Sequence, residues 1–314
     1  MAKFQRVLVT GGAGFIGSHL CRRLLRAKIK PVVLDNLSVG KKENVPRGAQ
    51  FIKGDIQNLR LAQKIIKNVD AVYHLAANVT IRGSVDKFYQ DAKTNIMGTL
   101  NLLRACRESK RVKKFILSSS MAVYADSSKP KPINESYPAK PISPYGVAKL
   151  ASERYVLLAC QQMGIESTIL RYFNTYGSGQ TFTPYVGVIT IFINLLLDNK
   201  SPTIFGDGEQ RRDFVYVGDI VEATFRVLKA KTNGQIFNVG TGRATSVNQI
   251  ARLLIDKIDP AAKINHEPAH AGELRYSIAD SSSLKRATGF KPTVKLSDKI
   301  DEVIDFIKKE RAGN

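Results

Sequence analysis

The stretch "VLVTGGAGFIGSHL", residues 7–20, decides how this chain begins to fold. An apolar run that is typical of a buried strand breaks at several glycines, and an amphipathic segment that is typical of a helix follows. Gly11, Gly14 and Gly17 are evenly spaced, and Gly12, Gly14 and Gly17 also fit the pattern GxGxxG. A tight turn could require these glycines. A loop without side chains would also let a diphosphate approach the backbone N–H groups at the start of the helix, where the helix dipole favours an anion.

The position of Asp35 favours a loop that binds a diphosphate over a simple tight turn. This residue ends the next apolar segment, "PVVLD" (31–35), where a carboxylate can accept hydrogen bonds from the ribose diol of a dinucleotide. A carboxylate there repels a 2′-phosphate, so the sequence favours NAD over NADP. Strand, glycine loop, helix, strand and acid follow one another in the order that a dinucleotide-binding unit requires. We therefore predict that this region binds NAD.

Strand-like and helix-like segments alternate through residues 1–175. Short apolar segments such as "RVLVT" (6–10), "KFILSSS" (114–120) and "STILRYFN" (167–174) alternate with amphipathic ones. This alternation predicts an α/β fold in which a doubly wound parallel sheet is covered by helices on both faces. We expect residues 1–175 to form a NAD-binding Rossmann domain.

The pattern changes after residue 175, where turn-rich stretches replace the strict alternation. We expect a smaller, interwoven α/β lobe that binds the substrate in residues 176–314. "DFVYV" (213–217) and "IFNVG" (236–240) still have the character of buried strands, so segments near 212–240 are expected to return to the first sheet. "VGVITIFINLLL" (186–197) is too short to cross a bilayer and is predicted to be a buried helix.

Charge and cysteine usage suggest which partners and location to expect. The chain has 314 residues and carries 48 basic against 27 acidic side chains, a net charge of +21. The basic residues are scattered and no nucleic-acid motif accompanies them, so we expect neither a nucleic acid nor a membrane as partner. Cys21, Cys106 and Cys160 show no metal-binding or redox spacing, which suggests no metal. Together with an N-terminus that lacks a signal-like segment, they favour a cytoplasmic location.

Tyr145 and Lys149 form the candidate catalytic pair. They lie at i and i+4 in "SPYGVAKLASE" and therefore share one face of a predicted helix. A neighbouring ammonium, together with a positively charged nicotinamide ring, favours the phenolate and allows it to act as a base. Ser120 ends "KFILSSS", at the sheet edge where such folds carry their sites, and could relay a proton. An interfacial tyrosine beside a lysine whose ammonium reaches solvent would explain the same spacing without chemistry.

Several motifs taken together resemble those of the extended short-chain dehydrogenase/reductase superfamily. They are "TGGAGFIGSHL", "LDNLSVG", "GDI", "HLAA", "SSSMAVY", "YGVAK", "LRYFNTYG" and "GDGEQRRDFVYVGDI". Within it, the chain is similar to nucleotide-sugar 4-epimerases of the UDP-glucose/UDP-galactose type. The resemblance implies that Tyr145 is the base, that Lys149 holds the nicotinamide ribose and that Ser120 completes the triad. To the glycines and Asp35 it adds NAD contacts from Phe15, Ile16, Asn36, Asp55, Ile56, Leu75, Ala76, Ala77, Asn95 and Ser118. The nucleotide sugar would be contacted by Asn174, Phe205, Arg212, His270, Glu273 and Ser277.

The resemblance also implies a reaction. Such enzymes oxidise the sugar C4 hydroxyl with retained NAD, turn the 4-keto sugar within the site and return the hydride to its opposite face. Relatives that dehydrate or decarboxylate the sugar carry an acid just after the serine, where this chain has Met121 and Ala122. We expect an isomerase acting on a UDP-hexose, with a dehydratase or other net oxidoreductase as the alternative. A non-catalytic dinucleotide-binding protein is a further alternative.

Two positions bear on the substrate. His270 stands where an arginine is usual, so either Arg211 or Arg275 compensates, or the diphosphate is held more weakly or differently. Ser277 falls where bulk limits the room beside the sugar C2 substituent. A small residue there predicts that UDP-GlcNAc and UDP-GalNAc are tolerated, unless Ser277 is an unrelated surface serine.

The resemblance implies a homodimer as well. In such enzymes, helices equivalent to 92–108 and 145–163 often pair across a dimer interface. The apolar spacing of these segments fits that arrangement, and it fits packing on the subunit's own sheet equally well. The apolar residues concerned are Ile96, Leu100, Leu103, Val156, Ala159 and Cys160.

Overall fold

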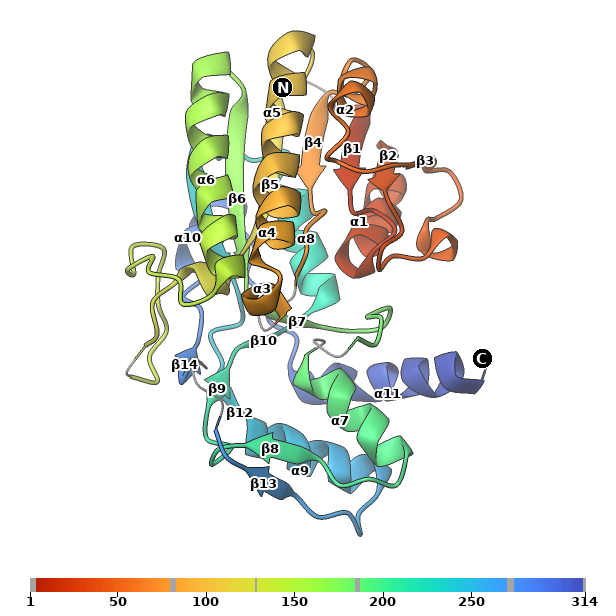
Figure 1. Ribbon diagram of the computed structural model, residues 1–314, viewed down its shortest axis with the longest axis vertical. Coiled ribbons are helices and arrows are strands. Elements are labelled where there is room, and N and C mark those ends of the chain that lie inside the picture. Colours follow the sequence, from red (N-terminus) through yellow and green to blue (C-terminus); the bar gives the residue numbers. More distant parts are fainter. Residues whose placement is uncertain (1–3, 80–82, 128, 184–186, 270–273, 313–314) are drawn as a thin grey trace.

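A computed structural model describes residues 4–79, 83–127, 129–183, 187–269 and 274–312 (Figure 1). Its centre is a parallel sheet of seven strands in the order β11-β6-β5-β4-β1-β2-β3. The strands are β1 (Arg6–Thr10), β2 (Lys30–Asp35), β3 (Gln50–Lys53), β4 (Ala71–His74), β5 (Lys114–Ser120), β6 (Glu166–Tyr172) and β11 (Gln235–Val239). After β3 the chain returns to the other side of β1 to form β4, so the sheet is doubly wound, as predicted.

Helices cover both faces of this sheet (Figure 1). α1 (Phe15–Arg26) and α8 (Val217–Val227) pack on one face. The other face is covered by α2 (Leu59–Ile66), α5 (Gly98–Ser109) and α6 (Pro144–Met163). Successive side chains of a strand point to opposite faces, and accordingly Val7 and Val9 join the first apolar cluster while Leu8 joins the second. Burial on both faces explains why the strands are continuous apolar runs.

A smaller lobe lies beyond the carboxyl ends of the strands, in the lower part of Figure 1. α7 (Val188–Leu197), α9 (Val247–Ile258) and α11 (Leu296–Ala312) share an apolar core of their own, and α7 is the predicted buried helix. The strands of this lobe are short. They are β8 (Thr203–Phe205) paired with β13 (Asn265–Glu267), and β9 (Arg211–Arg212) between β12 (Thr245–Ser246) and β14 (Tyr276–Ser277).

Less of the chain returns to the main sheet than the sequence predicts. "IFNVG" forms most of β11, which pairs with β6 as expected. "DFVYV" contains β10 (Phe214–Tyr216), which pairs with β7 (Asn174–Tyr176) in a separate sheet, so the prediction that it joins the first sheet is wrong. The reason is that β11 occupies the free edge of β6. The remaining elements are η1 (Lys42–Asn44), α3 (Gly83–Asp86), α4 (Phe88–Ala92), η2 (Lys93–Met97), η3 (Met121–Val123) and α10 (Ser282–Thr288).

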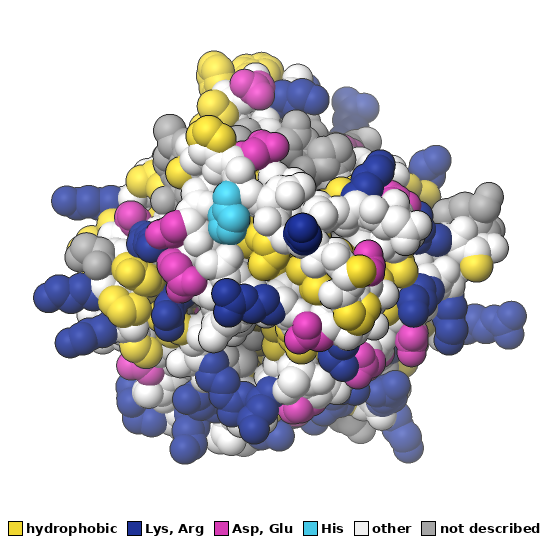
Figure 2. All heavy atoms as spheres, turned by 90° about the horizontal axis from the view of Figure 1, so that it is seen from below, with side chains coloured by type: hydrophobic (Ala, Val, Ile, Leu, Met, Phe, Trp, Pro, Cys, Tyr) yellow, Lys and Arg dark blue, Asp and Glu magenta, His cyan; other side chains and the backbone are white. Residues whose placement is uncertain are grey.

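The positive charge is spread out on the face shown in Figure 2, which looks at the molecule from below. Lys and Arg side chains lie around its whole outline, with Asp and Glu side chains between them. Among the surface charges of the molecule, Lys41 pairs with Glu310 at 2.9 Å and Lys257 with Asp301 at 2.8 Å, both partly exposed to solvent. Such pairs contribute little to stability. In the part of the chain that the structure describes, no helix has the length and apolarity needed to cross a bilayer.

His74 makes the stability of the fold depend on pH. It ends β4, is buried, and its ring nitrogens bond the hydroxyls of Thr10 at 2.8 Å and Thr99 at 2.9 Å. Burial lowers the pKa of His74 from 6.5 to about 3. The unfolded chain therefore binds a proton below pH 6.5 that the folded chain does not bind. This contribution to stability is complete above pH 6.5 and is lost as the pH falls towards about 3.

We expect the melting temperature to fall between about pH 7 and about pH 5, and to fall less steeply in His74→Gln. Thermal melts of both proteins over this range measure the difference. His19, whose pKa burial also lowers, is present in both and contributes in the same direction. Parallel curves for the two proteins would contradict the assignment to His74.

Candidate active site

The segment that joins β1 to the first turn of α1 has no room for side chains at two of its glycines. Gly11 has a φ of 70°, and a Cβ on it would lie 2.8 Å from the backbone N of Ala76. A Cβ on Gly17 would lie 2.1 Å from the backbone O of Gly11. Only glycine fits at these two positions. α1 begins at Phe15 with Gly14 as its N-cap, so no side chain covers the first N–H groups of the helix. This loop has the form of a diphosphate cradle.

The residues predicted to contact NAD gather at the carboxyl edge of the main sheet. Asp35 ends β2, and its carboxylate accepts hydrogen bonds from the backbone N–H of Ala13 at 3.0 Å and of Leu37 at 2.8 Å. These bonds hold Asp35 beside the glycine loop. Asn36 donates to Asp55 at 2.9 Å, which joins the segments after β2 and β3. At the same edge lie Ile56 after β3, Leu75, Ala76 and Ala77 after β4, and Ser118 within β5.

Asn95 lies in η2, a turn of π-helix between α4 and α5. Its side chain accepts a hydrogen bond from the backbone N–H of Asn78 at 2.9 Å and donates to the backbone O of the same residue at 3.0 Å. Asn78 belongs to the segment after β4. Widened turns of this kind are frequent at functional sites. The structure thus places Asn95 next to the other predicted NAD contacts.

Ser120, Tyr145 and Lys149 meet where α6 passes the end of β5. Ser120 is the last residue of β5, and Tyr145 and Lys149 lie on the first turns of α6. A hydrogen bond joins Ser120 to Tyr145, and both Tyr145 and Lys149 are buried. The helix can approach this closely because of Gly146, where a Cβ would lie 2.2 Å from the backbone O of Ala122. The predicted catalytic residues are therefore neighbours in space.

Burial dominates the proton affinities of the tyrosine–lysine pair. It raises the pKa of Tyr145 to about 12, although the hydrogen bond with Ser120 acts in the opposite direction. It lowers the pKa of Lys149 to about 8, against the attraction of Glu153 and Asp91. The protein's own side chains thus hold Tyr145 as a phenol at neutral pH. That Lys149 and a positively charged nicotinamide ring together make Tyr145 a working base stays a prediction, since it requires bound NAD.

Lys149 has buried charged neighbours that the sequence analysis did not predict. Glu153, on the next turn of α6, accepts hydrogen bonds from the Arg171 guanidinium at 2.9 and 2.6 Å and from the Ser119 hydroxyl at 2.5 Å. Asp91 on α4 is also buried. The i, i+4 spacing of Lys149 and Glu153 could have drawn attention to Glu153. Asp91 carries no comparable signal, because its place beside α6 depends on how α4 packs.

The structure brings together some of the predicted substrate contacts. The backbone N–H of Asn174 donates to the backbone O of Asp213 at 3.0 Å, directly after Arg212. Arg212 on β9 pairs in register with Ser277 on β14. Asn174, Arg212 and Ser277 therefore lie together between the two lobes. Phe205 lies at the end of β8, in the small lobe.

The structure describes only some of the residues predicted to bind the diphosphate. His270 and Glu273 lie outside the described residues. Arg275, one of the two proposed substitutes for an arginine at position 270, makes two hydrogen bonds to Asp207, at 2.7 and 2.8 Å. Its guanidinium is thus engaged. Arg211, the other proposed substitute, makes a longer ion pair of 3.8 Å with Glu209.

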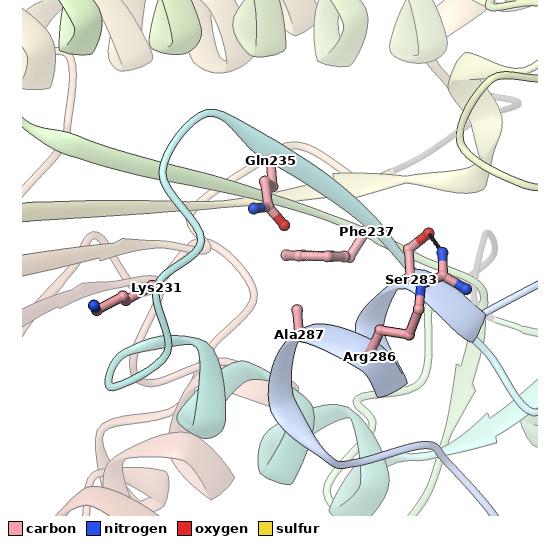
Figure 3. Close-up of a pocket in the computed structure, with 6 residues that line it drawn as sticks. All are labelled: Lys231, Gln235, Phe237, Ser283, Arg286 and Ala287. Carbon is pink, nitrogen blue, oxygen red and sulfur yellow. Dashed lines mark hydrogen bonds between the residues drawn. The ribbon is translucent and has the colours of Figure 1, made fainter.

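The described surface has one cavity away from the catalytic residues and another beside the start of α6. One of about 320 Å³, shown in Figure 3, lies between the edge strand β11 and α10. It is lined by Lys231, Gln235, Phe237, Ser283, Arg286 and Ala287, none of which is a predicted site residue. The other, of about 530 Å³, lies between α4 and the start of α6. The candidate site is therefore defined by its residues and not by either cavity.

Comparisons with known proteins agree with this arrangement. Residues 7–240 match the model of a family described as the NAD dependent epimerase/dehydratase family. A putative UDP-glucose 4-epimerase of Methanocaldococcus jannaschii is 40% identical over 303 residues, which cover 96% of this chain and 98% of that protein. The crystal structure of Thermotoga maritima UDP-glucose 4-epimerase with UDP-glucose has a TM-score of 0.93 at 38% identity, covering 98% of this chain and 100% of that one. A UDP-N-acetyl-alpha-D-glucosaminuronate decarboxylase of Bacillus cytotoxicus is 32% identical over 317 residues, covering 97% and 98%.

Proposed function

Because this chain belongs to the NAD dependent epimerase/dehydratase family, we propose that it is a UDP-sugar 4-epimerase, an isomerase that works with bound NAD. The observation that carries the proposal is the meeting of Ser120, Tyr145 and Lys149 at the sheet edge that also holds the glycine loop. UDP-glucose and UDP-galactose are the proposed substrate pair, in view of what the M. jannaschii and T. maritima proteins are named for.

The residues around the glycine loop fit NAD. The loop excludes side chains at Gly11 and Gly17, the first N–H groups of α1 are uncapped by any side chain, and Asp35 stands at the end of the neighbouring strand. Backbone donors suit the diphosphate, and the Asp35 carboxylate suits a ribose diol. When bound, NAD would supply a reversible acceptor for the hydride on the sugar C4.

Tyr145 and Ser120 are proposed to handle the proton of the C4 hydroxyl. The Tyr145 oxygen accepts that proton while C4 is oxidised to a ketone, and returns it once the sugar has turned to present its other face. The hydrogen bond with Ser120 lowers the pKa of Tyr145. The positive charges of Lys149 and of a bound nicotinamide ring would favour the phenolate that this step requires. Because the proton goes back to the molecule that released it, the protein ends the cycle unchanged.

A decarboxylase or dehydratase is the second candidate, since the B. cytotoxicus relative is named a decarboxylase. The residues after Ser120 speak against it. Met121 and Ala122 form η3 together with Val123, and all three are buried and apolar. None of these side chains can donate a proton to a leaving hydroxyl or take part in other acid–base chemistry. Epimerisation requires no such group.

Incubation with a panel of UDP-, dTDP- and GDP-hexoses, followed by chromatographic separation of the epimers, tests the proposal. We expect UDP-glucose and UDP-galactose to interconvert, with neither a steady rise in NADH absorbance nor release of water or carbon dioxide from the sugar. A folded protein that carries NAD and interconverts none of the panel would refute the proposed function.

Ser277 is proposed to set the room beside the sugar C2. It is buried on β14 in register with Arg212. We expect Ser277→Tyr to slow interconversion of UDP-GlcNAc and UDP-GalNAc by at least about tenfold more than that of UDP-glucose and UDP-galactose, because the ring takes the space of the acetyl group. Ser277→Ala, which adds no bulk, should keep both activities. Equal losses on both substrate pairs would count against this role.

We also propose that the chain forms a homodimer through α5 and α6. Five of the six apolar residues that the sequence offered for this interface pack instead on the subunit's own sheet: Leu100, Leu103, Val156, Ala159 and Cys160. The same region nevertheless exposes other apolar side chains. Tyr155 and Leu158 on α6 are 46% and 56% exposed, and Met97 and Val147 are 51% and 52% exposed. An exposed apolar face of this kind is typical of a protein–protein interface.

Leu158→Asp is expected to convert the dimer into a monomer, because it places a charge in the middle of the proposed apolar contact. Size-exclusion chromatography with light scattering gives the mass of each species. Val39→Asp is the matched control, since Val39 is 54% exposed but lies far from α5 and α6 in the sequence, in the segment after β2. A Leu158→Asp protein with the mass of the parent would rule out this interface.

A further inference from the structure

Asp91 carries a buried carboxylate that the proposed mechanism does not use. It lies on α4 and is 0% exposed. Its Oδ1 accepts a hydrogen bond from the Asn95 side chain at 3.0 Å, whereas Oδ2 has no hydrogen-bond partner among the described residues. A buried carboxylate oxygen without a partner is costly, so a compensating interaction is required.

That interaction comes from α6, against which α4 packs. Burial raises the pKa of the Asp91 carboxyl, while the Asn95 hydrogen bond and the positive charge of Lys149 lower it. On the other side lies the 530 Å³ cavity between α4 and α6, where Asp91 is the only ionisable residue among the described residues that line it. The charged neighbours along the chain are exposed: Asp86 on α3, Lys87 at the start of α4 and Lys93 on η2. Among the described residues, Lys149 is thus the cation that Asp91 faces.

The buried charges around Lys149 balance only if Asp91 is ionised. Arg171 and Glu153 form a buried pair with hydrogen bonds of 2.6 and 2.9 Å, and Ser119 donates a further bond to Glu153. Glu153 is therefore already engaged, and Lys149 needs a second anion. With Asp91 ionised, the two buried cations face two buried anions. With Asp91 neutral, one positive charge would stay buried without a counter-ion, which proteins avoid by releasing the proton.

We propose that Asp91 is the buried counter-ion of Lys149 and a positioning residue of the catalytic pair. Its carboxylate keeps the Lys149 ammonium charged and close to Tyr145, and the Asn95 side chain keeps the carboxylate in place. The effect of Asp91 on catalysis rests on the proposed function. The coupling between the two charges does not, and stability alone measures it.

Asp91→Asn is the first test, because it removes the charge while keeping the shape and an acceptor for Asn95. The negative charge of Asp91 raises the pKa of both Tyr145 and Lys149. Without it, both limbs of the pH–rate profile are expected to move to lower pH by about one unit. Asp91→Glu should restore the profile, and Asp86→Asn, which neutralises an exposed carboxylate, should leave it unchanged. An unshifted profile in Asp91→Asn would overturn the proposal.

Thermal melts of the protein without substrate give the second test. Lys149→Met leaves the Asp91 carboxylate without its cation, and Asp91→Asn leaves the Lys149 ammonium with only Glu153, which already pairs with Arg171. The double variant removes both charges, so we expect it to melt at a higher temperature than Lys149→Met alone. A double variant that melts no higher would overturn the coupling, whatever reaction the protein proves to catalyse. This comparison holds even if Asp91→Asn alone fails to fold.

Discussion

Tyr145→Phe is expected to lower the rate of UDP-hexose interconversion by about 10²–10⁴-fold, the contribution of a positioned acid–base group. The change removes a single oxygen, the one that hydrogen-bonds Ser120. The ring stays buried in the same place on α6, and the glycine loop is untouched. We therefore expect the variant to fold with an unchanged melting temperature and to retain the NAD content of the parent. Chromatographic rates and the NAD released on denaturation measure the two quantities separately.

Tyr137→Phe is the matched control for this prediction. Tyr137 also uses its hydroxyl in a hydrogen bond, to the backbone O of Asp126 at 3.1 Å, but it lies outside the candidate site. Its loss should leave the rate within about threefold of the parent, since a surface hydrogen bond of this kind contributes little. If Tyr145→Phe, with NAD bound, kept more than about a tenth of the parent rate, another group would have to be the base.

The fold was predictable where the information is local. Short apolar runs and amphipathic stretches alternate along residues 1–175, and each predicted strand in this part lies in the observed parallel sheet. For β10, the local sequence predicts the strand but not the sheet that it joins. β10 has the sequence of a buried strand and forms one. It pairs with β7, because β11 occupies the edge of β6 that β10 could have joined. Competition between two segments for one edge is a property of the assembled sheet and leaves no mark on either segment.

In the candidate site, too, some features follow from the local sequence and others depend on the assembled fold. Tyr145 and Lys149 are one helical turn apart, so their proximity follows from the helix alone, and Ser120 follows from the end of a strand. The residues that surround these three side chains could not be predicted from the sequence. Asp91 reaches them through the packing of α4 on α6. The burial that raises the pKa of Tyr145 in the protein alone arises only when helix and sheet come together, so the local sequence does not reveal it.

Gly17→Ala is expected to be among the most damaging single-methyl substitutions in the chain. The added Cβ would lie 2.1 Å from the backbone O of Gly11 and 2.8 Å from the Cα of Gly12. Both obstacles are backbone, so no side chain can rotate away and the loop itself must move. We expect a loss of stability of about 3 kcal/mol, the upper end of the usual cost of overpacking. Because the displaced loop is the proposed diphosphate cradle, bound NAD should fall by more than about tenfold, which requires only about 1.4 kcal/mol.

Gly187→Ala is the control that separates crowding from the general effect of replacing a glycine at the start of a helix. Gly187 caps α7 with an ordinary φ of −61°, and a Cβ there would meet no atom of the described residues within 4 Å. Its stability and NAD content should match those of the parent. Thermal melts and the NAD released on denaturation compare the two variants directly. A Gly17→Ala protein that behaves like Gly187→Ala would mean that the β1–α1 loop has room for side chains, and the cradle on which NAD binding is argued would have to be abandoned.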